Sequence, residues 1–316
     1  MINKRKIFIY LGLILTFLLL VFSTMFFYLK SQLSANRSPI IITENERRIS
    51  SPPIPDFLEF CGEKVPLEDF DVYERIDREF LVNTYWHSAT LLYFKRANRW
   101  FPIIEPILRA NGIPDDFKYM SVTESGLTNA VSPQEAVGFW QMLAPVAEKY
   151  NLEINDEVDE RYNVEKETQA ACDYLKEAYS KFKNWTLAAA SYNYGINGIE
   201  NTFQREKTKN YYNMYLNEET YRFVARIIAI KEIFKNPHMY GFYFSEGDLY
   251  KPIETYEVKI NSSINDLADF SKSYRVNYKI IKLFNPWFRQ NTLKNKLRKT
   301  YSIKLPKSGA IKFSND

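Results

Sequence analysis

The feature that most constrains this chain is an uncharged, mostly apolar run near its N-terminus. The run extends from Ile7 to Leu29, directly after the basic cluster Lys4–Lys6. A helix of this length, at about 1.5 Å per residue, would cross the roughly 30 Å hydrocarbon core of a bilayer. Basic residues beside a span stay on the cytoplasmic side. We therefore expect residues 1–30 to form a transmembrane anchor that leaves the rest of the chain outside the cytoplasm.

A cleaved signal peptide is the alternative interpretation of the same segment. Signal peptides have apolar regions of about 7–15 residues, followed by a small-residue cleavage site. The run here is longer, and its best cleavage site, around Ser34-Ala35, is weak. An uncleaved anchor is therefore favoured, whereas cleavage would give a secreted protein. In both cases the body is exported to the periplasm or cell envelope, which excludes nucleic acid as a natural partner.

The sequence is poor in the residues that bind metals and form disulfides. It contains 2 cysteines and 2 histidines among 316 residues. This excludes a disulfide scaffold and a cysteine-based zinc site, and it argues against a histidine-ligated metal centre. Cys61 and Cys172 could pair in an oxidising compartment, but we expect both to remain unpaired. The prediction is a protein without metal or cofactor.

Shifts in composition divide the chain behind the anchor. Residues 31–66 are polar and contain several prolines, which predicts a linker. Residues 67–112 have apolar side chains at three- and four-residue spacing and predict a helical N-terminal extension. The helical pattern continues over residues 113–240, the main body. Residues 250–316 change to a strand, helix, helix, strand pattern, which predicts a small α+β domain.

The net charge of +4 conceals an asymmetry along the chain. Residues 251–316 contain 14 Lys/Arg against 5 Asp/Glu, which leaves the first 250 residues with a net charge of −5. Such a basic surplus indicates nucleic acid, an anionic membrane surface or an acidic polymer as partner. Because export excludes nucleic acid, the C-terminal domain is expected to face the membrane or the cell wall.

Glu124 is the strongest candidate for a catalytic side chain. It lies near the end of a helix predicted to start at about Pro114, with Met120 one turn before it and Val122 beside it. Apolar surroundings disfavour a carboxylate, so the pKa of Glu124 should rise and the side chain could hold a proton near neutrality. This suits a general acid. The alternative is a solvated glutamate at a helix end.

The neighbours of Glu124 favour the catalytic interpretation. A site that cleaves glycosides needs a proton donor, flat faces for sugar rings, and polar groups for the ring substituents. Trp140 taken alone would be interpreted as core packing. The residues that could supply flat faces and polar groups are Trp140, Tyr192, Tyr194, Ser132, Gln141 and Asn193.

Short motifs occur in a fixed order between about Phe80 and Pro237. They are Arg96–Pro102, Gly112–Pro114, Glu124-Ser125, Gly138–Gln141, Ala190–Gly195 and Glu219-Thr220. In order and spacing these motifs resemble the lytic transglycosylases with the goose-type lysozyme fold. The resemblance implies an all-α lysozyme-like catalytic domain over residues 113–240.

The resemblance implies that Glu124 is the sole catalytic carboxylate of a peptidoglycan-cleaving enzyme. Glu124 would first protonate the oxygen of the β-1,4 bond between N-acetylmuramic acid and N-acetylglucosamine. It would then take the proton of the muramic C6 hydroxyl, which attacks the anomeric carbon and closes a 1,6-anhydro ring. Glycosidases normally use two carboxylates, and an intramolecular nucleophile removes the need for the second.

The same resemblance assigns substrate-binding roles around this acid. Tyr192 would hydrogen-bond near the acid and tune it, and Asn193 would support the adjoining loop. Ser132 and Gln141 would contact the glycan, with Trp140 as a flat face beside them. Glu219 lies where the family has an acid near the stem peptide, although a carboxylate in the first turn of a helix is an equal explanation.

The C-terminal domain resembles the lysin motif, a wall-binding module. The expected elements are Tyr256–Ile260, Ile264–Tyr274, Tyr278–Phe284 and Tyr301–Leu305, with a turn at Asn285-Pro286. The resemblance implies glycan binding that raises the local substrate concentration. The alternative is a degenerate module that packs against the enzyme and keeps a solvated basic face.

Together these features predict a membrane-tethered peptidoglycan lytic transglycosylase. The alternatives are a hydrolytic muramidase on the same fold, or a peptidoglycan-binding protein without catalytic activity. The expected partners are peptidoglycan glycan strands, the membrane through the N-terminal helix, and cell-wall synthesis or division proteins.

Overall fold

The computed structural model describes residues 19–26, 28 and 49–312. The chain divides into two units, residues 1–50 and residues 51–316. Most of the expected anchor (residues 1–30) and the first half of the expected linker lie outside the described residues. Within the described part of the chain, no helix is both long enough and apolar enough to cross a membrane.

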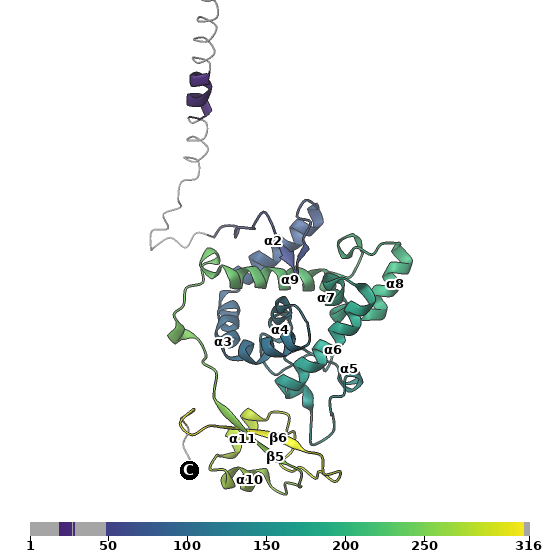
Figure 1. Ribbon diagram of the computed structural model, residues 1–316, viewed down its shortest axis with the longest axis vertical. Coiled ribbons are helices and arrows are strands. Elements are labelled where there is room, and N and C mark those ends of the chain that lie inside the picture. Colours follow the sequence, from purple (N-terminus) through teal and green to yellow (C-terminus); the bar gives the residue numbers. More distant parts are fainter. Residues whose placement is uncertain (1–18, 27, 29–48, 313–316) are drawn as a thin grey trace, which may run out of the picture. The chain divides into compact units, whose positions relative to one another are not determined.

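The second unit consists of a helical body and a small C-terminal α+β part (Figure 1). The helices of the body are α2 (Phe70–Tyr85), α3 (His87–Ala110), α4 (Lys118–Ser125), α5 (Ala144–Lys149), α6 (Val164–Phe182), α7 (Trp185–Tyr194), α8 (Ile196–Glu206) and α9 (Glu218–Lys235). Short 3-10 turns lie between these helices at Asp115–Phe117, Glu160–Tyr162 and Tyr211–Asn213, and two more follow α9 at Pro237–Tyr240 and Glu246–Asp248.

Asparagine caps begin several of these helices. Asn163, Asn184 and Asn217 each accept a hydrogen bond from a backbone N–H in the first turn of α6, α7 and α9, respectively. A side-chain acceptor at this position satisfies an N–H group that has no partner inside the helix. The caps therefore fix where α7 and α9 begin, and with them the positions of the polar residues near those ends.

Helix α4 lies at the centre of the body, where it packs on α3 and α9 (Figure 1). Its residues Met120 and Val122 are fully buried. The helix ends at Gly126, which has the left-handed φ of 59°. A Cβ at Gly126 would lie 2.8 Å from the ring of Tyr93, so a larger residue would force that ring to move as well as strain the backbone. Glu124 is thereby held in the last turn of a buried helix.

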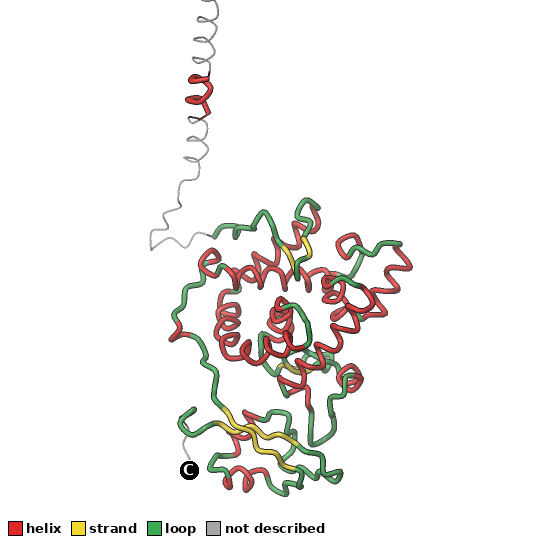
Figure 2. Tube along the Cα trace, viewed as in Figure 1, coloured by secondary structure: helices red, strands yellow, loops and turns green. Residues whose placement is uncertain are grey.

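Three two-stranded antiparallel sheets complete the second unit, as Figure 2 shows by short yellow pairs in a largely helical trace. Two belong to the body and one to the C-terminal part. They pair β1 (Glu59–Phe60) with β2 (Glu63–Lys64), β3 (Ala130–Val131) with β4 (Val137–Gly138), and β5 (Thr255–Ile260) with β6 (Tyr301–Pro306). The prediction of a mainly helical body is confirmed, with these hairpins as an addition.

The end of the expected linker differs from a free tether. Residues 51–66 include the β1–β2 hairpin, and its Phe60 and the following Val65 are buried in the core of the body. Burial of apolar side chains of this size stabilises the docked position by about 1.5–3 kcal/mol each. This part of the chain therefore belongs to the folded body.

The C-terminal part has the predicted order of strand, helix, helix, strand. Helices α10 (Leu267–Ser273) and α11 (Tyr278–Phe284) lie between β5 and β6 in the sequence. Its own apolar core contains Ile281, Phe288 and Ile303, all fully buried. The predicted α+β architecture is confirmed.

Candidate active site

A cleft of about 770 Å³ opens over the end of α4. Its walls come from the β3–β4 hairpin, from the segment that follows it, and from residues of α4 to α9. It brings together most of the residues that the sequence singled out: Glu124, Ser132, Gln141, Tyr192, Asn193, Tyr194 and Glu219.

Glu124 is a partly buried residue whose carboxyl group lies in the last turn of α4 and lines this cleft. Burial raises the pKa of Glu124 to about 8, and the negative charge of Glu219 adds to the increase, whereas Arg226 opposes it. The predicted upward shift is confirmed. Glu124 therefore carries a proton at neutral pH and can donate it.

Ser132 in the β3–β4 hairpin and Gln141 just after it both line the cleft. The hydroxyl oxygen of Ser132 accepts hydrogen bonds from the backbone N–H groups of Gln134 (3.2 Å) and Ala136 (3.0 Å). The side-chain amide of Gln141 donates to the carbonyl oxygens of Ala130 (3.0 Å) and Gly138 (2.8 Å). Because both amide hydrogens are used by the protein, Gln141 can offer a ligand only its oxygen, as an acceptor.

Trp140 is not part of the cleft, and the prediction that it offers a flat face to sugars is wrong. Its side chain is fully buried, and its indole N–H donates to the hydroxyl of Thr168 at 2.9 Å. The ring has no face open to a ligand because it fills the core behind the loop. Trp140 therefore supports the loop that carries Gln141, which is the packing role considered as its alternative.

Glu167 is a residue that sequence reasoning missed. Its fully buried carboxylate accepts the backbone N–H groups of Phe139 (2.7 Å) and Trp140 (3.1 Å). A Cβ at Gly138 would lie 2.4 Å from both carboxylate oxygens of Glu167, which explains the glycine of this motif. The only signal for Glu167 in the sequence was its place as an acidic residue in the first turn of a helix. Such residues are common on protein surfaces.

Burial has a large effect on the protonation of Glu167. It raises the pKa of Glu167 well above its ordinary value, while the backbone N–H bonds and Arg161 act in the opposite direction. The role of the carboxyl group is to shape the loop, because its oxygens are used by backbone donors and not by the cleft.

Tyr192 reaches the site through its hydroxyl group. That hydroxyl donates to the carbonyl oxygen of Trp140 at 2.9 Å, and the ring packs edge-on against Tyr174. Burial raises the pKa of Tyr192 well above its ordinary value, and the nearby Glu124 contributes. Tyr192 remains neutral and joins α7 to the loop of Gln141.

Asn193 and Glu219 connect the end of α7 to the start of α9. The side-chain amide of Asn193 donates to Glu219 at 3.3 Å, and the hydroxyl of Thr220 donates to the amide oxygen of Asn193 at 2.7 Å. These hydrogen bonds tie the end of α7 to the first turn of α9. Glu219 is exposed and lines the same cleft as Glu124.

Two families match this chain. Residues 102–215 match the family described as "Transglycosylase SLT domain", and residues 256–309 match the "Soluble lytic transglycosylase C-terminal LysM-like domain". The chain carries an SLT domain followed by a LysM-like domain. The resemblance to the lytic transglycosylases is thereby confirmed.

Curated relatives agree with the SLT assignment. The chain is similar to "Membrane-bound lytic murein transglycosylase D" of Escherichia coli strains K12 and O6:H1, with 24% identity over 250 residues in each case. The matched region covers 76% of this chain and 54% of each relative. The chain thus spans about half the length of these relatives.

The site extends beyond the residues that match the SLT domain. Helices α2 and α9 lie outside the match, yet α9 carries Glu219 and Arg226. The fully buried carboxylate of Glu79 on α2 accepts hydrogen bonds from Arg222 (2.9 Å) and Arg226 (3.1 Å). Since the positive charge of Arg226 lowers the pKa of Glu124, the N-terminal extension helps to set the field in the cleft.

Metal ligands do not cluster in the described part of the SLT and LysM-like domains. Among the described residues, no group of three or more His, Cys, Asp or Glu side chains could hold a metal ion. Cys61 is half-buried and Cys172 is buried, and both are free thiols.

Proposed function

We propose that this protein is a peptidoglycan lytic transglycosylase with Glu124 as its acid and base. The observation that carries the proposal is a carboxyl group with a pKa of about 8 that lines a polar cleft in an SLT domain. A group that is protonated at neutral pH is suited to protonate a leaving oxygen. The similarity to lytic murein transglycosylase D supports the choice of peptidoglycan as substrate.

The proposed reaction has two proton transfers through one carboxyl group. Glu124 donates its proton to the glycosidic oxygen, and the bond from that oxygen to the muramic anomeric carbon breaks. The resulting carboxylate takes the proton of the C6 hydroxyl on the same muramic residue. The C6 oxygen then bonds to the anomeric carbon, which closes the 1,6-anhydro ring and regenerates protonated Glu124.

The polar groups of the cleft suit the acetamido groups of such a glycan. The oxygen of Gln141 is available as an acceptor for an N-acetyl N–H group, because its amide hydrogens bind the protein. Ser132 and Tyr194 lie on the same cleft and offer hydroxyl groups. We propose that these residues bind the glycan, with Asn193 and Tyr192 as supports behind them.

Analysis of the digestion products tests the proposed reaction. Purified peptidoglycan is incubated with the chain, and the released muropeptides are weighed by mass spectrometry. A transglycosylase gives anhydromuramic ends, and each cut adds no mass of water. Products that all carry one added water per cut would overturn the proposal.

A hydrolytic muramidase is the second candidate, because Glu219 supplies another carboxylate in the cleft of Glu124. In that reaction Glu219 would take the proton of a water molecule that attacks the anomeric carbon. Glu219→Gln separates the two candidates. Retained formation of anhydro products in this variant supports the transglycosylase, whereas loss of all cleavage supports the muramidase.

We further propose the domain division and location predicted from the sequence. Residues 1–30 would anchor the protein. Of the predicted linker, residues 31–66, the part before the folded body (residues 31–50) would lift the SLT domain from the membrane, and the LysM-like domain would bind glycan. Washing cell membranes with high salt and with detergent tests the anchor. Release by detergent alone is expected, and release by salt would contradict anchoring.

A further inference from the structure

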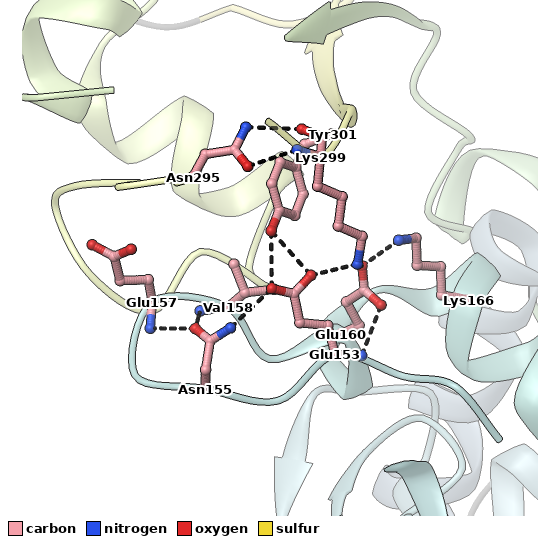
Figure 3. Close-up of polar contacts among 9 residues, drawn as sticks. All are labelled: Glu153, Asn155, Glu157, Val158, Glu160, Lys166, Asn295, Lys299 and Tyr301. Carbon is pink, nitrogen blue, oxygen red and sulfur yellow. Dashed lines mark hydrogen bonds and ion pairs between the residues drawn. The ribbon is translucent and has the colours of Figure 1, made fainter. Parts of the chain in front are cut away.

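Residues Glu153–Arg161 of the SLT domain pack against the LysM-like domain, and we call them the docking segment. The segment is a tight hairpin, in which Ile154 pairs with Asp159 and the backbone N–H of Asn155 donates to the carbonyl of Val158 at 2.7 Å. The side-chain oxygen of Asn155 accepts the N–H of Glu157 at 2.9 Å, as Figure 3 shows. The tip of the docking segment is therefore stabilised by hydrogen bonds within the segment.

The tip of the docking segment completes the core of the LysM-like domain. Val158 is 1% exposed and lies in the same apolar cluster as Trp287 and Phe288. Val158 pairs with Phe288, and the N–H of Asp159 donates to the carbonyl of Trp287 at 3.0 Å. The LysM-like domain thus uses an apolar residue of the SLT domain as part of its interior.

Acidic side chains of the docking segment bind polar groups of the LysM-like domain. Glu157 accepts hydrogen bonds from the hydroxyl of Thr292 (2.7 Å) and the N–H of Lys294 (2.8 Å). Glu153 pairs with Lys299 and accepts the hydroxyl of Tyr301 at 2.9 Å (Figure 3). Part of the basic surplus of the C-terminal domain is therefore neutralised by the SLT domain.

The other end of the docking segment holds the loop of the cleft. Arg161 is buried, and its Nη1 donates to the carbonyl oxygens of Glu135 (3.1 Å) and Met142 (3.2 Å). Its Nε and Nη2 bind the carboxylate of Asp159 at 3.0 and 2.8 Å. Its own carbonyl lies so close to Gly138 that a Cβ there would be 2.2 Å away.

Asp159 and Arg161 together thus contact both the LysM-like domain and the loop of the cleft. Asp159 binds Trp287 of the LysM-like domain through its backbone and Arg161 through its side chain. Arg161 in turn binds both ends of the segment between Glu135 and Met142, which includes Gln141. The path from the LysM-like domain to the substrate-binding loop is a continuous series of hydrogen bonds and packed groups.

We propose that Asp159 and Arg161 are positioning residues, through which the docked LysM-like domain holds the Ser132–Met142 loop in its substrate-binding shape. The LysM-like domain then contributes to cleavage by its position on the SLT domain, in addition to any binding of glycan. The effect on cleavage rests on the proposed function. The effect on the loop does not.

Hydrogen exchange in the full chain tests the effect on the loop directly. The double variant Glu153→Gln/Glu157→Gln weakens docking without changing side-chain size, and Glu74→Gln, an exposed glutamate of α2, is the matched control. Peptides covering residues 292–301 report docking, and peptides covering residues 132–142 report the loop. We expect about tenfold faster exchange in both regions of the double variant, the effect of losing one or two hydrogen bonds, and no change in the control.

A second variant disrupts docking of the LysM-like domain more strongly. Val158→Asp places a carboxylate in the core of the LysM-like domain and should undock it completely. Faster exchange in residues 132–142 of this variant supports the proposal. Unchanged exchange there, in a variant whose residues 292–301 exchange faster, overturns it.

Kinetics separate positioning from catalysis. Arg161→Lys keeps the positive charge but loses the forked donor geometry, so we expect KM to rise about tenfold while kcat and the pH profile change little. A changed pH profile, or a loss confined to kcat, would overturn the assignment to loop position. If the wild-type chain cleaves no peptidoglycan, the proposed function fails, while the exchange result still decides whether docking holds the loop.

Discussion

Glu124 in the cleft and Glu153 in the docking segment are both partly buried glutamates, yet their pKa values move in opposite directions. Burial and the nearby Glu219 raise the pKa of Glu124 to about 8. Burial also disfavours the charge of Glu153, but hydrogen bonds from Lys299 and Tyr301 outweigh it and lower the pKa of Glu153. The comparison shows that burial raises the pKa of both groups, and that only at Glu153 does the fold provide donors that outweigh this effect.

The largest expected effect comes from replacing Glu124, the member of this comparison that lies in the cleft. Glu124→Gln replaces the carboxyl group by an amide, which has no acidic proton to donate. We therefore expect kcat on peptidoglycan to fall about 10³-fold. Release of soluble muropeptides measures the loss, and the circular dichroism spectrum should be unchanged. Activity within tenfold of wild type would contradict the assigned role.

The next effect concerns the buried carboxyl group behind the cleft. Glu167→Ala leaves the N–H groups of Phe139 and Trp140 without their acceptor, which should lower the free energy of unfolding by about 3 kcal/mol. Urea denaturation measures this change. Glu165→Ala, in the same turn of α6 but only half-buried, is the control and should cost less. Equal losses in the two variants would show that Glu167 has no special part in shaping the loop.

The raised pKa of Glu124 also predicts a pH dependence of stability. The folded state binds the proton more tightly than the unfolded state, so the folded protein loses stability as the pH rises from about 4.5 to about 8. The slope from this one group is at most about 1.4 kcal/mol per pH unit. Glu124→Gln should remove it, and the melting temperature of the variant should exceed that of wild type at pH 8 but not at pH 4. A constant difference across this range would contradict the raised pKa.

The smallest expected effect concerns docking. Burial opposes the charge of Glu157, but hydrogen bonds from Lys294 and Thr292 lower its pKa, as those from Lys299 and Tyr301 do for Glu153. These carboxylates stabilise docking above their ordinary pKa of about 4.3, and the contribution is lost as the pH falls through their lowered values. Each contributes less than about 1 kcal/mol because both are partly solvated. The protection factors of residues 292–301, which correct exchange for its intrinsic pH dependence, should be lower at pH 3 than at pH 6, and in Glu153→Gln this difference should be smaller.

Local pattern predicted much of the fold. The first expected strand of the C-terminal domain, Tyr256–Ile260, is observed as Thr255–Ile260, and the expected helix Tyr278–Phe284 is observed with the same bounds. The first helix begins at Leu267 and not at the predicted Ile264, because Ile264 instead pairs with Leu293 and Asp266 provides the cap. Alternation and helical spacing are properties of neighbouring residues, so they can be read from the sequence.

The candidate site was predicted in part. Residues near Glu124 in recognisable motifs, such as Gln141 and Tyr192, do line one cleft with it. Trp140 was misassigned because a tryptophan looks the same in a sequence whether its ring is exposed or buried. Glu167 and Arg161 were missed because their importance comes from contacts with residues 19–28 positions away, at Phe139–Met142.

The sequence by itself determined the order of elements and the family, and it singled out Glu124 as the proposed acid. Each of these depends on residue type, spacing or local periodicity. Only the tertiary structure decided which glutamates have a raised pKa, which aromatic rings line the cleft, and that Val158 of the SLT domain lies inside the LysM-like domain. The physical reason is that burial, electric field and hydrogen-bond partners depend on distances between residues far apart in the chain, and folding alone sets those distances.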